Sequence, residues 1–266
     1  MFKKLTLSLF VLLLSSGLQA QSLGLSVFNL IMGLAHNKSV PLEVVDPPLP
    51  KQEVQLRWKK SMAEVRELNK AIAKYPDSAA LVFRRAICRT SFDAATAMED
   101  FRKCIKMDYL ADSCRFRLAI YHHYTSPRVA LDLFDKLVEK NGSHPGLYYY
   151  RGVTHLLWGT NNGRSLKNES ELAIPEFDNA LRLNGNYWEA FFMRGFAKQK
   201  AGDYAGAALD YSKVMELKPE LDYLLLFRGA AYQDSGNAER ACQDFQAAAR
   251  KGIEGSDKFL KKYCGR

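Results

Sequence analysis

The chain has 266 residues, of which 47% are hydrophobic and 25% are charged, with 17 Gly and 9 Pro. These fractions are ordinary for a globular protein and exclude collagen-like, low-complexity and wholly disordered classes. The formal net charge is +9, and it falls to +7 if the segment that holds Lys3 and Lys4 is removed. A positive balance of this size permits weak attraction to anionic surfaces such as a membrane, but it demands no nucleic-acid partner.

The first twenty residues have the three parts of a secretory signal peptide. Two lysines precede the apolar run from Leu5 to Leu14, and small and polar residues follow up to Ala20. The run is too short for a transmembrane helix, which needs roughly 20 residues. We expect cleavage after Ala20 and export, to a bacterial periplasm or cell envelope. The alternative is an uncleaved anchor, because residues 23–35 are apolar again.

Residues 21–50 predict a tether, and residues 51–77 predict a long N-terminal helix. The tether contains Pro41, Pro47, Pro48 and Pro50, and proline lacks an amide donor and pushes the preceding residue out of the helical region. From residue 54 to residue 74 the chain has neither Pro nor Gly, and apolar residues recur at steps of three and four. That spacing is typical of an amphipathic helix.

A pattern recurs five times between residues 78 and 253, which is the signature of a repeat protein. The repeats cover residues 78–110, 111–144, 145–187, 188–221 and 222–253. The twentieth position is always alanine: Ala97, Ala130, Ala173, Ala207 and Ala241. The twenty-fourth is always aromatic: Phe101, Phe134, Phe177, Tyr211 and Phe245. The eighth is Gly152, Gly195 and Gly229 in the last three repeats, whereas Arg85 and Leu118 depart from this.

This pattern resembles the tetratricopeptide repeat, a 34-residue helix-turn-helix unit. The resemblance implies an all-α, right-handed solenoid of helix pairs, A and B, in which small residues let the two helices approach and the aromatic residue fills the wedge between them. A stacked array needs a polar-faced end, and residues 254–266 predict a C-terminal capping helix. The third repeat is nine residues longer than a standard repeat, and we expect the extra residues to form a polar loop over residues 160–170.

An arginine at the seventh position and an acid at the twenty-third position predict an ion pair inside the repeats. The arginines are Arg84, Arg117, Arg151, Arg194 and Arg228, and the opposing residues are Asp100, Leu133, Glu176, Asp210 and Asp244. Because four of the five arginines have an acid at matched spacing, we favour structural ion pairs over an arginine ladder for an anionic ligand. Arg117 has no acid at that position, although Asp132 lies beside it.

Export makes disulfides relevant. Cys242 and Cys264 flank one predicted turn between antiparallel helices, and Cys104 and Cys114 flank another. Both pairs therefore meet the distance condition for a bridge as far as sequence can judge. Cys88 remains as a buried thiol. The alternative is that all five cysteines are thiols in packed helices.

No motif predicts an enzyme, a metal site or a cofactor. The five histidines lack metal-binding spacing, and His122 and His123 are sequential, so that they point about 100° apart on a helix. The resemblance implies a concave groove lined by the A helices, which receives a peptide. The candidate binding residues are Arg115, His122, Tyr149, Phe192, Phe196, Gln199 and Tyr223.

We therefore expect a non-catalytic scaffold of the cell envelope that binds a protein or peptide partner in this groove. One alternative is a structural subunit of an envelope assembly, docked through residues 23–35. Another is an enzyme with a site near residues 160–170. A further alternative concerns the groove itself: Phe192 and Phe196 would pack on the next helix and leave little space for a ligand.

Overall fold

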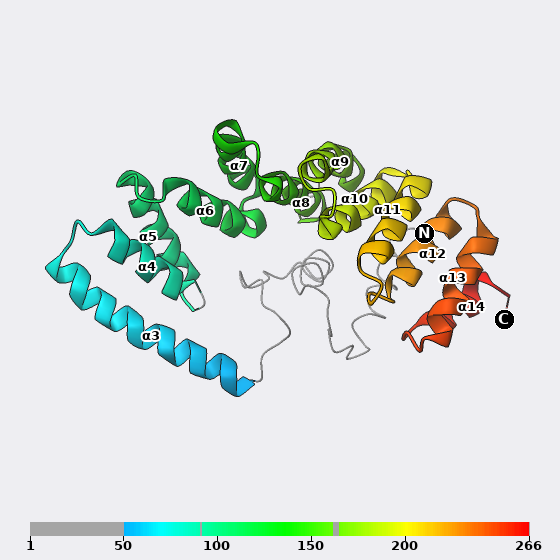
Figure 1. Ribbon diagram of the computed structural model, residues 1–266, viewed down its shortest axis with the longest axis horizontal. Coiled ribbons are helices and arrows are strands. Elements are labelled where there is room, and N and C mark those ends of the chain that lie inside the picture. The colour runs from blue at the N-terminus through cyan, green and yellow to red at the C-terminus, as the bar shows by residue number, and fades with distance from the viewer. Residues whose placement is uncertain (1–50, 91, 162–164, 266) are drawn as a thin grey trace. The chain divides into compact units, whose positions relative to one another are not determined.

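The computed structural model describes residues 51–90, 92–161 and 165–265. Over these ranges the chain forms twelve helices, α3 to α14, and no strand, which confirms the all-α prediction. The helices (Figure 1) belong to two compact units, and the boundary in the chain lies between Ser143 and His144. We expected a single array over residues 51–266. The division falls at the end of the second repeat, and each unit is described by itself.

The N-terminal unit contains the predicted long helix and the first two repeats. Its helices are α3 (Lys51–Lys74), α4 (Ala79–Arg89), α5 (Ala94–Lys106), α6 (Ala111–Thr125) and α7 (Pro127–Asn141). From α4 onward, each helix of this unit packs on the one that precedes it. Helix α5 begins after Asp93, whose carboxylate accepts a hydrogen bond from the Thr96 amide at 3.3 Å and satisfies an otherwise unpaired donor of the first turn.

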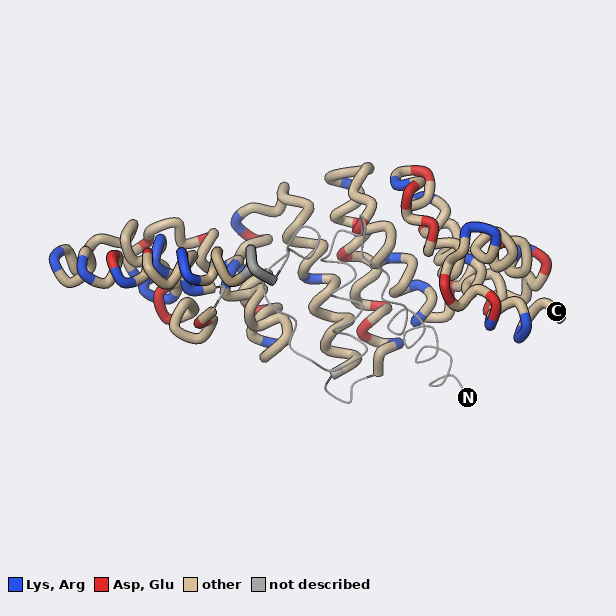
Figure 2. The backbone as a smooth tube through the Cα atoms, turned by 90° about the horizontal axis from the view of Figure 1, so that it is seen from below, with Lys and Arg blue, Asp and Glu red and all other residues tan. Residues whose placement is uncertain are grey.

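The C-terminal unit contains the last three repeats and the capping helix. Its helices are α8 (Pro145–Asn161), α9 (Leu166–Leu183), α10 (Trp188–Ala201), α11 (Tyr204–Leu217), α12 (Leu224–Asp234), α13 (Ala238–Arg250) and α14 (Ser256–Tyr263). From α9 onward, every helix of this unit packs on its predecessor. Charges of both signs are spread over the helices of both units (Figure 2). Among the described helices, none is both long enough and apolar enough to cross a lipid bilayer.

The repeat pattern has the packing role that the sequence predicts. All five alanines at the twentieth position and all five aromatic residues at the twenty-fourth have no exposed surface. A Cβ atom added at Gly229 would lie 2.6 Å from the Phe245 ring, and one added at Gly195 would lie 3.0 Å from the Tyr211 ring. Glycine is therefore needed where helix A meets the aromatic residue of helix B.

The predicted polar loop over residues 160–170 is wrong for the residues that the structure describes. Helix α8 continues to Asn161 and α9 begins at Leu166, so most of the extra chain lengthens these two helices. Two features explain the result. The Ser165 hydroxyl accepts a hydrogen bond from the Asn168 amide and caps α9. Gly159 allows α8 and α9 to approach each other closely, since a Cβ atom added there would lie 2.9 Å from the Cα atom of Leu166.

Helix α14 ends the C-terminal unit, as the sequence predicts. The rings of Phe259 and Tyr263 stack on Phe245 of α13, with centroids 5.0 and 6.0 Å away. The expected signal peptide (1–20), the tether (21–50) and the apolar segment 23–35 lie outside the described residues.

Candidate functional site

The arginines of the last three repeats form the predicted ion pairs. Each guanidinium holds its carboxylate through Nε and a terminal nitrogen, which is the strong, fork-like geometry of an arginine–carboxylate pair. The shorter contacts are 2.8 Å for Arg151–Glu176, 2.5 Å for Arg194–Asp210 and 2.7 Å for Arg228–Asp244. These arginines are therefore structural: each is held by the carboxylate of its own repeat, and Arg194 also binds Asp178 of the preceding repeat at 2.6 Å.

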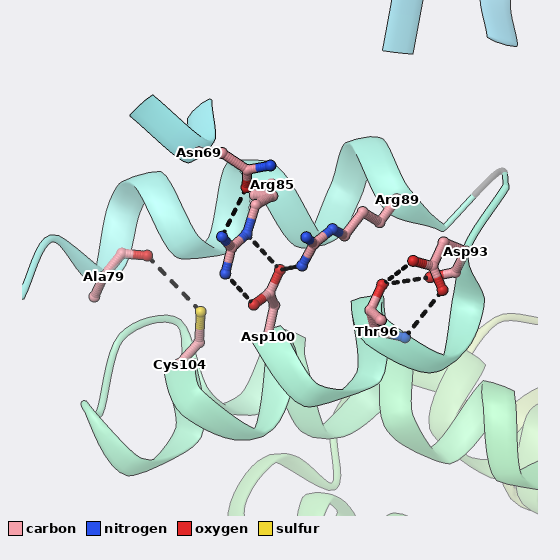
Figure 3. A network of polar contacts seen from close by, with 8 residues as sticks. All are labelled: Asn69, Ala79, Arg85, Arg89, Asp93, Thr96, Asp100 and Cys104. Carbon is pink, nitrogen blue, oxygen red and sulfur yellow. Dashed lines mark hydrogen bonds and ion pairs between the residues drawn. The ribbon is translucent and has the colours of Figure 1, made fainter. Parts of the chain in front are cut away.

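In the first repeat the predicted partner of Asp100 is wrong by one residue. Arg85, not Arg84, donates to Asp100 at 2.9 and 2.6 Å, and Arg89 adds a third bond at 2.7 Å (Figure 3). Arg84 binds Glu64 of α3 at 2.7 Å instead. Ala86 then becomes the small residue without exposed surface that faces helix B.

A shorter spacing accompanies this shift: Arg85 and Asp100 lie 15 residues apart, whereas Arg194 and Asp210 lie 16 residues apart. In the fourth repeat the turn after helix A uses Gly202 with φ of +100°. The same register places Phe92 there in the first repeat, and a residue with a side chain seldom adopts that conformation. Helix α4 ends at Arg89, two residues before the position that corresponds to the end of α10, and presents the next residue of the helix to Asp100.

Arg117 forms no ion pair within the described ranges, and Asp132 does not replace the missing acid. The Arg117 guanidinium lies over the Phe101 ring, 5.8 Å from the ring centroid. Burial lowers the pKa of Arg117 from its ordinary value. The contact with the ring indicates a packing role.

Arg115 and His122, the predicted basic rim, belong to the N-terminal unit, whereas the other five candidates belong to the C-terminal unit. Arg115 is held by Asp112 at 2.6 Å, and Asp112 also binds Lys140 at 2.7 Å. These two cations lower the pKa of Asp112, Lys140 more than Arg115. The Nε2 atom of His122 lies 3.4 Å from a terminal nitrogen of Arg102, and burial together with Arg102 lowers the pKa of His122.

Two predicted groove residues, Tyr149 and Phe192, are core residues. Phe192 has no exposed surface and packs against Tyr211 and Phe227, with ring centroids 5.8 and 5.4 Å away. Tyr149 is 4% exposed, and its ring lies 5.1 Å from that of Tyr187. The alternative in which Phe192 packs on the next helix is therefore the right one, because α10 is covered there by both α11 and α12.

The remaining candidates on α10 lie beside two residues that the sequence analysis did not select. We call Phe196, Gln199, Lys200 and Asp234 the α10–α12 cluster; all four are partly buried. The Lys200 ammonium lies 5.0 Å from the centroid of the Phe196 ring. Nε2 of Gln199 donates to Oδ2 of Asp234 at 3.1 Å and so joins α10 to α12. Lys200 and Asp234 both occupy the thirteenth position of their repeats. This shared position is the feature of the sequence by which they could have been selected.

Buried polar groups accompany this cluster on α12 and at its N-cap. The Tyr223 hydroxyl, at the N-cap of α12, is buried and has no hydrogen-bond partner among the described residues, and burial raises its pKa. Oε1 of Gln233, next to Asp234, is likewise a buried acceptor for which the described chain provides no donor. Burial also lowers the pKa of Lys200 to about 8, against the opposing effect of Asp234.

The two predicted cysteine pairs differ in the structure. Cys242 and Cys264 form a disulfide with a Cα–Cα distance of 5.6 Å, which ties α14 to α13. Cys104 and Cys114 are buried neighbours in one hydrophobic cluster but carry thiols, so the structure corrects the expectation of a bridge there. Burial, followed by the proximity of Cys104, raises the pKa of Cys114 to about 12. A thiol that resists ionisation resists disulfide exchange.

Over the described ranges, no group of three or more His, Cys, Asp or Glu side chains is placed to hold a metal ion. His155 and Glu169 form a pair at 2.9 Å where the lengthened helices α8 and α9 meet. This pair lies inside the third repeat and stabilises the extension.

Comparison with known proteins shows similarity at the level of structure. A scan against protein-family models gave no match, and neither did a search of curated protein sequences. Among solved structures, the chain is similar to MamA protein (20% identity, TM-score 0.58), over 71% of this chain and 96% of the other. It is also similar to YrrB, described as a TPR protein with an unusual peptide-binding site. The identity is 22% and the TM-score is 0.55, over 68% of this chain and 90% of the other.

A third similar structure is a tetratricopeptide repeat protein from Parabacteroides merdae, with 17% identity and a TM-score of 0.55 over 75% of this chain and 80% of the other. Identities this low establish the fold alone. Together with the helix pairs, the buried alanine and aromatic positions and the glycine contacts described above, they show that the chain has the fold of the tetratricopeptide repeat proteins.

Proposed function

We propose that the chain is a non-catalytic protein-interaction scaffold of the cell envelope, and that a protein or peptide partner binds helices α10 and α12. The observation that carries this proposal is the α10–α12 cluster, in which a partly buried aromatic ring lies beside an ammonium group without an ion pair. Partly buried apolar groups next to incompletely satisfied polar groups are typical of surfaces that bind peptides.

The chemistry of the repeats supports a binding role. Side chains that could otherwise serve catalysis or bind anions are engaged within the fold: the arginines of the last three repeats hold carboxylates, and Arg115 holds Asp112. The similar structure of YrrB, described as having an unusual peptide-binding site, supports the same class of function for this fold.

The proposed envelope location is supported by sequence and by covalent chemistry. Residues 1–20 have the composition of a secretory signal peptide. The Cys242–Cys264 disulfide is the kind of bond that persists in oxidising compartments such as the periplasm. Fractionation of the source cells tests this part: the mature chain is expected in the periplasmic or envelope fraction, and full-length chain confined to the cytoplasm would contradict it.

Site-specific photo-crosslinking tests the binding surface. A photoreactive residue replaces Phe196, and in a matched variant it replaces Glu216, an exposed residue of α11. We expect a discrete crosslinked partner from position 196 and none from position 216. Equal crosslinking from both positions, or none from position 196, would contradict the proposal. A partner that is captured from both positions and lost on deletion of residues 23–35 would favour the structural-subunit alternative instead.

A further inference from the structure

Lys200 of α10 has no anionic partner among the residues that the structure describes, unlike Arg194 and Lys198 of the same helix. Arg194 binds Asp210 and Asp178, and the Lys198 ammonium lies 2.9 Å from Asp210. Lys200 forms no ion pair with any residue in the described part of the chain. Removing a charge from water costs free energy unless an opposite charge compensates. The chain by itself leaves this ammonium incompletely compensated.

The surroundings of Lys200 explain why none of the described residues near it supplies that charge. The Phe196 ring covers one side of the ammonium at 5.0 Å, and a ring face returns only part of the lost hydration. Asp234 is the acid that acts on Lys200, but its carboxylate is held by Gln199, and Gln199 in turn accepts a hydrogen bond from the Tyr211 hydroxyl at 3.2 Å. This chain of hydrogen bonds anchors Asp234 outside ion-pair distance of Lys200.

Gln233 provides a second, independent observation. It precedes Asp234 in α12, and its side-chain oxygen is buried without a donor among the described residues. Helices α10 and α12 therefore each carry one polar group that the described residues do not satisfy: the Lys200 ammonium has no anion, and Oε1 of Gln233 has no N–H donor. An extended peptide offers both, an acidic side chain and its backbone amides, once Gln233 turns toward it.

We propose that the partner segment carries an acidic side chain, Asp or Glu, that binds the Lys200 ammonium, next to an apolar side chain that contacts Phe196. This inference rests on the proposed function and specifies the partner for the same surface. A neutral or basic segment would remove the Lys200 ammonium further from water without supplying an opposite charge. The selectivity for an acidic segment therefore comes as much from this desolvation cost as from the new ion pair.

Selection from a phage-displayed library of random twelve-residue peptides tests the inference. The targets are the disulfide-bonded wild type, Lys200→Met, which keeps most of the stem over Phe196, and Lys213→Met. Lys213 is the matched control, because it lies on α11 and is paired with Glu216 at 2.8 Å. We expect wild-type selections to enrich Asp or Glu beside an apolar residue. The matching synthetic peptide should bind Lys200→Met at least about tenfold more weakly, with Lys213→Met unchanged within about twofold.

Two further arms separate the possible results. When the acidic residue of the peptide is replaced by its amide, the affinity for the wild type should fall as much as it does in Lys200→Met. The affinity of the same amide peptide for Lys200→Met should fall no further. Amidating the peptide's C-terminus should change nothing, because the side chain is the proposed ligand. Binding of the selected peptides to Phe196→Ala separates the inference from the proposed function. Peptides that lose binding to Phe196→Ala but show no acidic preference would overturn this inference and leave the proposed function standing. Selections without any peptide that loses binding to Phe196→Ala would overturn both.

Discussion

Arg85 of α4 holds Asp100 of α5 through two nitrogen atoms at 2.9 and 2.6 Å, while its neighbour Arg84 turns to Glu64 of α3. Asp100 is 1% exposed. A buried carboxylate of this kind is tolerated only because cations surround it, and Arg89 completes the arrangement (Figure 3).

The first prediction follows from this arrangement. Replacing Asp100 by Ala leaves two partly buried guanidinium groups without their carboxylate, and we expect the free energy of unfolding to fall by about 3 kcal/mol. Arg84→Ala removes only an ion pair whose arginine side chain is 67% exposed, and it should cost less than about 1 kcal/mol. Urea unfolding followed by circular dichroism measures both. Equal losses would assign Asp100 to Arg84 after all.

The second prediction concerns the close contact between helices α12 and α13. In Gly229→Ala the new methyl group would lie 2.6 Å from the Phe245 ring, which has no free space to move into. We expect a loss of about 1–3 kcal/mol in unfolding free energy. The matched control is Gly185→Ala, where nothing lies within 4 Å, and its effect should stay within about 0.5 kcal/mol. If Gly229→Ala were as neutral as the control, the packing role of the eighth position would be refuted.

The third prediction concerns the cysteines. Denatured, unreduced protein from an oxidising compartment should show three thiols, at Cys88, Cys104 and Cys114, and one disulfide-linked peptide that joins Cys242 to Cys264. Reduction opens a loop of 22 residues, which is worth about 3 kcal/mol in the chain-entropy model. Hydrogen exchange should then accelerate first in α14, which has a neighbour on one side only. Five thiols, or uniform acceleration over both units, would contradict this account.

The fourth prediction is a pH dependence of binding. Burial lowers the pKa of Lys200 to about 8, so the ammonium is present below that pH and is lost above it. Affinity for an acidic peptide should therefore be full near pH 7 and weaken as pH rises through 8 to 9.5, whereas Lys200→Arg keeps its charge. Asp234 on α12 is the charged group that acts on Lys200 from another helix. An identical decline in both proteins would show that the decline does not come from the Lys200 ammonium.

The fold could be predicted from the sequence because the same small and aromatic residues recur at the same positions of the five repeats. Ala241 and Phe245, for example, are identified by their spacing alone and are buried as expected. The first repeat shows where that reasoning ends. Its turn lacks the glycine that the fourth repeat has at Gly202, and α4 is shifted by one residue, which the motif does not encode.

The candidate site was predicted only in part. Position in the repeat led to Phe196 and Gln199, which lie in the α10–α12 cluster, but it also selected Phe192, whose burial depends on Tyr211 and Phe227 from two other helices. Lys200 was passed over because a lysine in a sequence carries no sign of how much water it loses. Its importance appears only when the ion pairs of its neighbours have been assigned.

The central claim is that the A helices α10 and α12, rather than the B helices α11 and α13, bind the partner. Mapping of amide chemical shifts by NMR during titration with a library-selected peptide tests this most directly. The account predicts shifts concentrated in residues 188–201 and 224–234, largest around Phe196 and Lys200, and absent in Lys200→Met at the same peptide concentration. Shifts concentrated in residues 204–217 and 238–250 would contradict it.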